Sequence, residues 1–322
     1  MSSLRSFMER NFHHFNARET LEAAQAYERH IGEGGKMLVS MAGAMSSGRI
    51  GITLARMIRE DKVHAVSCTA ANLEEDLFNL VGRNGYEMVP HYRDLTPEQE
   101  TEIADRGMYR VTDTLIPEAA MTTIEKLMTE LWEEAEEEDE AYSPSEYFYK
   151  LIRSGKLEPH HVLDPAESWV LAACEKDIPI YSPGFEDSTL GNIFTALIID
   201  EELEAHDTVK PGTEQMEDLV HWYLDNCQGK GVGFFQIGGG IAGDFAICAV
   251  PLIIEDLERK DTPLWSYFAQ ISDSTTSYGS YSGAVPNEKI TWRKLAADTP
   301  RYMINSDAMI VAPLIFGYVL GD

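Results

Sequence analysis

Positive charge is scarce in this chain of 322 residues, which has 26 lysines and arginines against 54 aspartates and glutamates. The formal net charge at pH 7 is therefore −28. A protein so acidic repels phosphate backbones and attracts cationic small molecules. We expect no nucleic-acid partner, and we expect amines or guanidines as ligands.

Cysteine is scarce too, and the four cysteines lie far apart with no C-x-x-C pair. They are Cys68, Cys174, Cys227 and Cys248. This usage favours a reducing compartment and buried thiols. Residues 1–15 lack the apolar core of a secretory signal. We therefore expect a cytoplasmic protein.

Long apolar runs and several catalytic motifs are also missing. The longest uncharged apolar stretch, residues 308–321, is shorter than the roughly 20 residues of a membrane span and is expected to be a core helix. The histidines form neither H-x-x-x-H nor H-E-x-x-H, so no metal site is expected. Without G-x-S-x-G or a P-loop lysine, hydrolase and kinase functions have no support.

Short apolar runs alternate with amphipathic segments along the chain. Residues 36–43 are typical of a buried strand and turn, followed by apolar side chains at helical spacing. Residues 63–67 predict a second strand and 72–80 a helix, with Glu74 and Glu75 in its first turn. Further strands are expected at 178–181, 232–237 and 302–305, each before a helix. This alternation predicts an α/β fold whose mostly parallel sheet has helices on both faces.

The middle of the chain interrupts this alternation. Residues 116–155 are expected to be helical, and seven of the eight residues in 133–140 are acidic. The acidic run is either a solvated helix end or loop, or a patch that recruits cations. Because no Gly/Ser linker divides the chain, we expect residues 1–322 to form one domain with this helical insertion.

A glycine-rich turn follows the strand predicted at 232–237. Residues 238–243 fit G-x-G-x-x-G, in which bare backbone amides can approach a pyrophosphate. Asp244 is expected in the first turn of the next helix, where a carboxylate would oppose a phosphate bound at the same place. Asp244 is therefore either a helix-start acid or points toward a positive ligand. Residues 46–48 offer a similar but less specific anion nest.

The segment 272–294 has no apolar periodicity, and long irregular segments within compact domains tend to be functional. If its end is extended, Ile290, Trp292 and Lys294 share one face, which would place the Lys294 amine beside an indole. Desolvation there would favour the neutral amine that Schiff-base chemistry requires. The alternative is that Lys294 is an ordinary surface lysine.

Five motifs together resemble the deoxyhypusine synthase family, and the likeness runs from about Lys36 to the C-terminus. The motifs are residues 46–48, 69–76, 182–191, 238–240 and 283–294, the last followed by Asp307 and Ala308. The resemblance implies a Rossmann-like, doubly wound fold, NAD as cofactor, and a homotetramer with active sites at subunit interfaces. It also implies that Lys294 forms the enzyme-imine intermediate.

The resemblance assigns further residues by their positions in these motifs. Those that would line NAD are Ala42, Gly43, Ala44, Met45, Ser46, Thr69, Ala70, Ala71, Glu75, Asp187, Gly239, Asp273, Ser274, Asp307 and Ala308. Those that would line the amine site are Glu74, Asn192, Asp244, Gly279, Ser280, Tyr281, Glu288 and Trp292. Glu75 and Glu288 are alternative proton shuttles.

Three departures from the family pattern bear on the substrate. Asp244 stands where spermidine-using members have a histidine, and Asn192 and Tyr281 stand where they have aspartates. Because a carboxylate can bind a guanidinium bidentately, a ligand with one amine and one guanidinium fits this chain better than spermidine. The pattern is similar to a bacterial subgroup that condenses two agmatines to 1,9-bis(guanidino)-5-aza-nonane, a precursor of homospermidine.

The resemblance implies a mechanism without net redox change. NAD+ takes hydride from the carbon that bears the agmatine amine, Lys294 captures the imine and ammonia leaves. A second agmatine then displaces Lys294, and the hydride returns. Two other functions remain open: aminobutyl transfer from spermidine to a protein lysine or to putrescine, and polyamine binding without turnover.

Overall fold

The computed structural model describes residues 3–275 and 279–322, so part of the irregular segment 272–294 lies outside the described residues. The strands are β1 Lys36–Met41, β2 Ala65–Cys68, β3 Glu87–Met88, β4 Met108–Val111, β5 Thr114–Pro117, β6 Ile180–Tyr181, β7 Val232–Ile237, β8 Tyr267–Ile271 and β9 Arg301–Ile304. The helices are α1 Leu4–Asn11, α2 Phe15–Gly32, α3 Gly51–Arg59, α4 Ala70–Gly82, α5 Pro97–Asp105, α6 Glu118–Glu138, α7 Pro144–Arg153, α8 Trp169–Lys176, α9 Thr189–Ile199, α10 Gly212–Asn226, α11 Gly240–Ile247, α12 Ala249–Pro251, α13 Glu288–Thr291 and α14 Ala308–Leu320.

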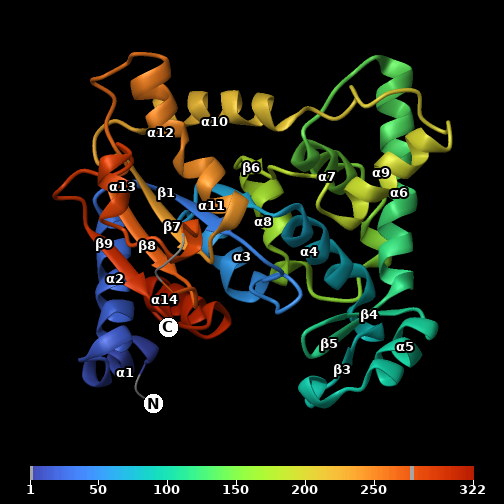
Figure 1. Cartoon of the computed structure of the whole chain (residues 1–322), viewed down its shortest axis with the longest axis horizontal. Helices are drawn as coiled ribbons and strands as arrows, with labels where there is room; N and C mark the ends of the chain where they lie inside the picture. The colour runs from blue at the N-terminus through green and yellow to red at the C-terminus, as the bar shows by residue number, and fades with distance from the viewer. Residues whose placement is uncertain (1–2, 276–278) are drawn as a thin grey trace.

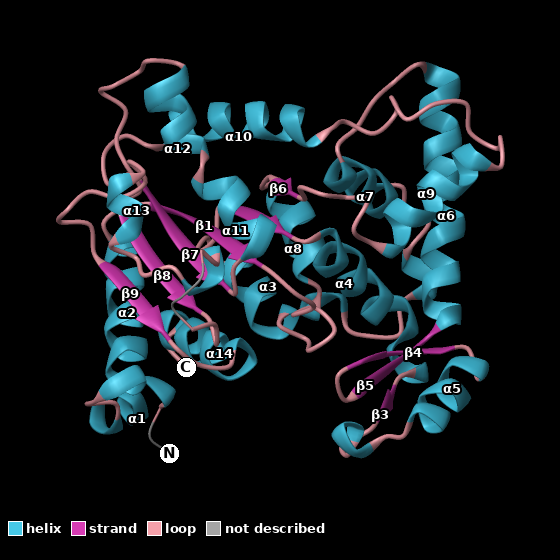
Figure 2. Ribbon diagram, in the orientation of Figure 1, coloured by secondary structure: helices cyan, strands magenta, loops and turns pink. Residues whose placement is uncertain are grey.

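Six strands form the main sheet in the order β6-β2-β1-β7-β8-β9, and every pairing within it is parallel (Figures 1 and 2). Counted in chain order, this is the 3-2-1-4-5-6 arrangement of a doubly wound Rossmann fold. The strand order reverses between β1 and β7, whose carboxyl ends lie side by side. The predicted parallel α/β sheet is confirmed.

Both faces of this sheet are covered because its strands are apolar on both sides. In β7, Phe235 and Ile237 pack into one core with α2, α3 and α14, whereas Val232 and Phe234 pack into a second core with α10, α11 and α12. Such two-sided burial is typical of parallel strands. The stretch predicted to be a core helix at 308–321 is α14, with its Pro313 inside the helix.

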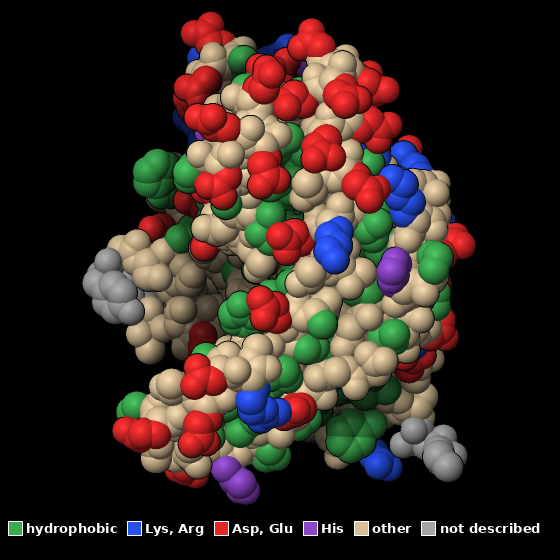
Figure 3. Space-filling view, turned by 90° about the vertical axis from the view of Figure 1, so that its right-hand side faces the viewer, with side chains coloured by type: hydrophobic (Ala, Val, Ile, Leu, Met, Phe, Trp, Pro, Cys, Tyr) green, Lys and Arg blue, Asp and Glu red, His purple; other side chains and the backbone are tan. Residues whose placement is uncertain are grey.

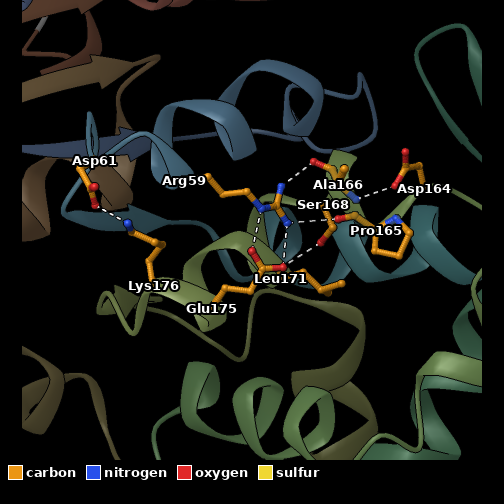
Figure 4. Close-up of polar contacts among 9 residues, drawn as sticks. All are labelled: Arg59, Asp61, Asp164, Pro165, Ala166, Ser168, Leu171, Glu175 and Lys176. Atoms are coloured by element: carbon orange, nitrogen blue, oxygen red, sulfur yellow. Dashed lines mark hydrogen bonds and ion pairs between the residues drawn. The ribbon is translucent and has the colours of Figure 1, made fainter.

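Polar contacts attach α8 to α3 at the edge of the first core (Figure 4). The Arg59 guanidinium donates to both carboxylate oxygens of Glu175, at 2.7 and 2.9 Å, and to the carbonyl of Ala166 at 2.6 Å. Lys176 and Asp61 form a second ion pair across the same two segments. The Ser168 hydroxyl accepts from the Leu171 amide and so caps the start of α8.

The middle of the chain differs from the prediction of a helix over 116–155. It contains β5, α6, a break at 139–143 and α7, and β5 joins β3 and β4 in a three-stranded antiparallel sheet. The acidic run 133–140 is the largely exposed end of α6, which agrees with a solvated helix end. Acidic side chains gather on the upper part of the face in Figure 3, on the side where α6 and α9 lie in Figure 1.

Two local predictions are wrong, and one strand of the main sheet was missed. Helix α4 begins at Ala70 rather than residue 72, because the Thr69 side chain caps it, and Glu74 and Glu75 therefore lie beyond its first turn. Strand β8 was not predicted. Cys248 is only partly buried, unlike the other three cysteines. Among the described residues, no helix is long and apolar enough to cross a membrane.

Candidate functional site

Two turns meet at the carboxyl edge of the sheet, where its strand order reverses. Gly238 and Gly240 have φ of 77° and 57°, a conformation that side chains disfavour. A Cβ on Gly238 would lie 3.0 Å from Cβ of Ala42, so the turn after β7 packs closely on the turn after β1. Space beside Gly240 is open. In doubly wound folds, ligands bind at this place.

The turn after β1 is held by hydrogen bonds to α4 and α8. The Ser46 amide donates to Oδ1 of Asn72 at 2.9 Å, and the Ser46 hydroxyl donates to the Asn72 carbonyl at 2.6 Å. Nε1 of Trp169 donates to the same hydroxyl, and the Ser47 amide donates to Glu75. The amides of the anion nest expected at 46–48 are thus already used within the fold at Ser46 and Ser47.

The remaining residues assigned to the cofactor lie after the other strands. Asp273 and Ser274 follow β8, and Asp307 and Ala308 follow β9. Asp307 also caps α14, since its carboxylate accepts from the Met309 amide at 2.7 Å. Because carboxyl ends of parallel strands share one edge of the sheet, these residues are on the same edge as the glycine turn.

Glu74 and Glu75 lie at an open cavity of about 580 Å³. The cavity also contains Ala71, Asp187, Ser188, Thr189, Asn192, Ile193 and Ala196. Burial raises the pKa of Glu75 to about 7. Both oxygens of Glu74 accept backbone amides at the start of α9, from Thr189 and Leu190, each at 2.9 Å. Glu74 therefore stabilises the start of this helix.

A second cavity, of about 650 Å³, contains most of the residues assigned to the amine site. It is lined by Met216, Asp244, Cys248, Pro251, Leu252, Asp256, Gly279, Ser280, Tyr281, Gly283, Ala284, Glu288, Lys289, Trp292 and Lys294. Glu74 and Asn192 line the other cavity, so the structure of one chain separates them from Lys294.

Lys294 is buried at the wall of this second cavity, with 6% of its surface exposed. Its Nζ lies 3.1 Å from Oδ1 of Asp244 and 5.4 Å from the ring centroid of Tyr281. The Cys248 thiol donates to the same carboxylate oxygen at 3.5 Å. The Tyr281 hydroxyl donates to Oε1 of Gln236 at 2.8 Å, which fixes the ring. The alternative of a surface lysine is wrong.

The predicted extended end of the segment 272–294 is wrong as well. Residues Glu288–Thr291 form the short helix α13, and Arg293 turns with φ of 52°. Trp292 is consequently 64% exposed while Lys294 is buried. The aromatic ring that Lys294 contacts is Tyr281 rather than the indole.

Asp244 also differs from its predicted place. It lies past the first turn of α11, which begins at Gly240, and contacts Lys294 directly at the cavity wall. Of the two alternatives, the structure supports an acid directed at a positive group. Sequence reasoning missed Cys248, although its spacing of four from Asp244 on a helix would have placed the two together. It also missed Lys289 and Met216.

The chain is similar to proteins of one family along nearly its whole length. A family model described as deoxyhypusine synthase matches residues 6–319. A protein named "Probable deoxyhypusine synthase 1" from Archaeoglobus fulgidus is 25% identical over 309 residues, covering 95% of this chain and 90% of that protein. A deoxyhypusine synthase-like protein from Cyanothece sp. is 26% identical over 294 residues, covering 88% and 70%.

Solved structures agree on the fold. The crystal structure of a deoxyhypusine synthase candidate from Entamoeba histolytica has a TM-score of 0.60 and 12% identity, covering 99% of this chain and 91% of that one. Because the family model spans nearly the whole sequence, the chain belongs to the deoxyhypusine synthase family, whose members are transferases that use NAD.

Proposed function

We propose that this chain condenses two agmatine molecules to 1,9-bis(guanidino)-5-aza-nonane and releases ammonia, as a step of homospermidine synthesis. The observation that carries the proposal is the pair of Lys294 and Asp244, 3.1 Å apart within one cavity. The cavity supplies a buried amine for imine chemistry and carboxylates for a cationic substrate.

The residues at the reversal of the strand order fit NAD. The turn at 238–240 carries no side chains, and the open space beside Gly240 admits a ligand to the backbone. Residues 42–46, 69–71, 273–274 and 307–308 lie at the same edge of the sheet and would hold the cofactor. When bound, NAD would accept a hydride from the amine-bearing carbon of the substrate and later return it.

The residues of the amine cavity bind and position the substrate. Lys294 adds through its neutral amine to the carbon that bears the departing nitrogen. Asp244, Asp256 and Glu288 give the cavity a negative wall for cations. Of the two candidate proton shuttles, Glu288 is an exposed acid that lines the Lys294 cavity, whereas Glu75 lies at the other cavity.

Asp244 favours a guanidine substrate for a geometric reason. Its side chain is half exposed to the cavity although one oxygen pairs with Lys294. A guanidinium that binds this carboxylate bidentately replaces the ammonium of Lys294 as its partner. Binding of the guanidinium thus ends the ion pair between Asp244 and Lys294.

The two cavities also bear on assembly. The family resemblance implies a homotetramer with active sites between subunits, and residues assigned to one amine site are divided between two cavities of the chain. In the proposed assembly, Asn192 of one subunit faces the Lys294 cavity of another. A mass measurement of the native protein in solution tests it, and a monomer that is fully active would contradict it.

The reaction is tested by mass spectrometry of the protein incubated with NAD+ and, separately, with agmatine, putrescine and spermidine. We expect agmatine alone to give a product equal to two agmatines minus ammonia. Lys294→Ala should abolish it, whereas the exposed Lys126→Ala on α6 should not. Asp244→Asn should weaken turnover of agmatine far more than turnover of putrescine, and equal losses would remove the role given to Asp244.

A second function is favoured by the family itself, since the deoxyhypusine synthase model matches residues 6–319 and a relative named "Probable deoxyhypusine synthase 1" is similar over 95% of the chain. That function is aminobutyl transfer from spermidine. It predicts that spermidine is consumed and diaminopropane is released in the same experiment. Diaminopropane without any agmatine product would therefore replace the proposed reaction by this one.

A further inference from the structure

A second lysine is buried in the wall of the cavity that contains Lys294. Lys289 has 3% of its surface exposed, and its Nζ has no hydrogen-bond partner among the described residues. A buried amine without a partner is costly, so its presence is unusual for a lysine that serves only packing. Nothing in the proposed chemistry described above uses it.

Aromatic rings and other charged groups surround this amine. Its Nζ lies 4.8 Å from the ring centroid of Tyr281 and 5.0 Å from that of Phe268. The charges that act on it are those of Lys294, Glu288 and Asp244. Burial, followed by the charge of Lys294, lowers the pKa of Lys289 to about 8, and the two carboxylates act in the opposite direction.

The two lysines share one aromatic neighbour. The Nζ atoms of Lys289 and Lys294 both lie within 5.4 Å of the centroid of the Tyr281 ring. A Coulomb interaction acts equally on both partners. The positive charge of Lys294 disfavours the ammonium form of Lys289, so the positive charge of Lys289 disfavours the ammonium form of Lys294 to the same extent. Oδ1 of Asp244 lies 3.1 Å from Nζ of Lys294, and a carboxylate attracts an ammonium, which has no lone pair and cannot form a bond to carbon.

We propose that Lys289 is a positioning residue that activates Lys294: its positive charge counteracts Asp244 and so favours the neutral, nucleophilic amine of Lys294. A lysine beside a second cationic group in an apolar pocket is activated in this way. The inference rests on the proposed role of Lys294 as the imine-forming lysine. It adds a residue that motif matching did not assign.

The test measures Lys294 alone, without NAD and without any polyamine. Each protein is treated with butanal and cyanoborohydride between pH 6 and 10, and alkylation of each lysine is followed by peptide mass spectrometry. Lys289→Met should slow alkylation of Lys294 at pH 7.5 about tenfold. Lys289→Arg, which keeps the charge, should restore most of the rate, and Lys126→Met should change nothing.

Two results would overturn the inference. One is alkylation of Lys294 with the same pH dependence in Lys289→Met as in the unchanged protein. The other is alkylation of Lys289 in place of Lys294. If Lys289→Met does not fold, Lys294→Met gives the reciprocal measurement, because removing that charge must raise the pKa of Lys289 above about 8. An unchanged value there refutes the coupling.

The alkylation test of Lys289 and the agmatine assay of the proposed reaction can fail independently of each other. Failure of agmatine as a substrate would leave the alkylation of Lys294 by butanal unaffected. Conversely, an agmatine product formed equally well by Lys289→Met at every pH would keep the proposed reaction and remove Lys289 from it.

Discussion

Glu74 was assigned to the amine site by resemblance, whereas its contacts indicate a structural role. Both of its oxygens accept amides at the start of α9, each at 2.9 Å, and the side chain is buried. Glu74→Gln keeps one acceptor and turns the other into an NH2 group that faces an amide donor. An unsatisfied buried donor costs about 1–3 kcal/mol. Burial raises the pKa of Glu74, so removing its charge recovers part of this loss.

We therefore expect Glu74→Gln to lower the free energy of unfolding by about 2 kcal/mol. With an unfolding entropy of roughly 2 cal/mol/K per residue, this lowers the melting temperature by about 3 °C. Glu133→Gln, in the exposed acidic run, makes the same charge change and should have no such effect. Differential scanning calorimetry measures the melting temperature, and steady-state kinetics measure the KM for the amine; together they distinguish a structural role from substrate binding. An unchanged melting temperature with a raised KM for the amine would refute the structural role and restore substrate binding.

Three further changes have definite expected outcomes. Burial raises the pKa of Glu75 to about 7, so between pH 4.5 and 7 the folded protein keeps a proton that the unfolded chain loses. The free energy of unfolding therefore falls as the pH rises through this range. Glu75→Gln should remove up to about 3 kcal/mol of this fall, as measured by urea unfolding. A Cβ at position 239 would lie 2.0 Å from the Ser282 hydroxyl, so Gly239→Ala should displace the turn and weaken NAD binding about tenfold. Titration calorimetry measures this affinity, and an unchanged affinity would show that the turn at 238–240 does not bind NAD. Arg59→Met removes the contacts to Glu175 and should lower the melting temperature by about 1–2 °C; no change would show that this partly exposed pair does not stabilise α8.

Five of the six strands of the main sheet followed from the sequence because short apolar runs mark them, whereas β8 did not. The run 232–237 is strand β7 with the predicted bounds, and the stretch at 308–321 is α14. The small antiparallel sheet did not follow. Its strands are two to four residues long, and β3 is exposed, so neither length nor alternation distinguishes them from loops. Only their pairing makes them strands.

The candidate site was predictable as a set of residues but less so as a geometry. Motif matching selected Lys294, Asp244 and Tyr281, which line one cavity. The indole contact was wrong because the distinction between an extended segment and a single helical turn depends on packing, which a stretch of eight residues does not specify. Lys289 escaped notice because a lysine in a polar sequence looks exposed, whereas in the structure its amine is buried beside the Tyr281 and Phe268 rings.

The residues that line the cavity of Lys294 all come from helices and loops of the second half of the chain, from Met216 in α10 to Lys294 after α13. The turn after β1 is instead held by Asn72 and Trp169 from the first half. In the proposed function, the substrate cavity and the turn after β1 that would hold the cofactor are therefore supported by different parts of the chain. Exchanging residues 244–294 between relatives should transfer the preference for an amine substrate. The turn at 42–46 should keep its hydrogen bonds to Asn72 and Trp169 in such an exchange, so the substrate can change while the first half of the chain stays the same.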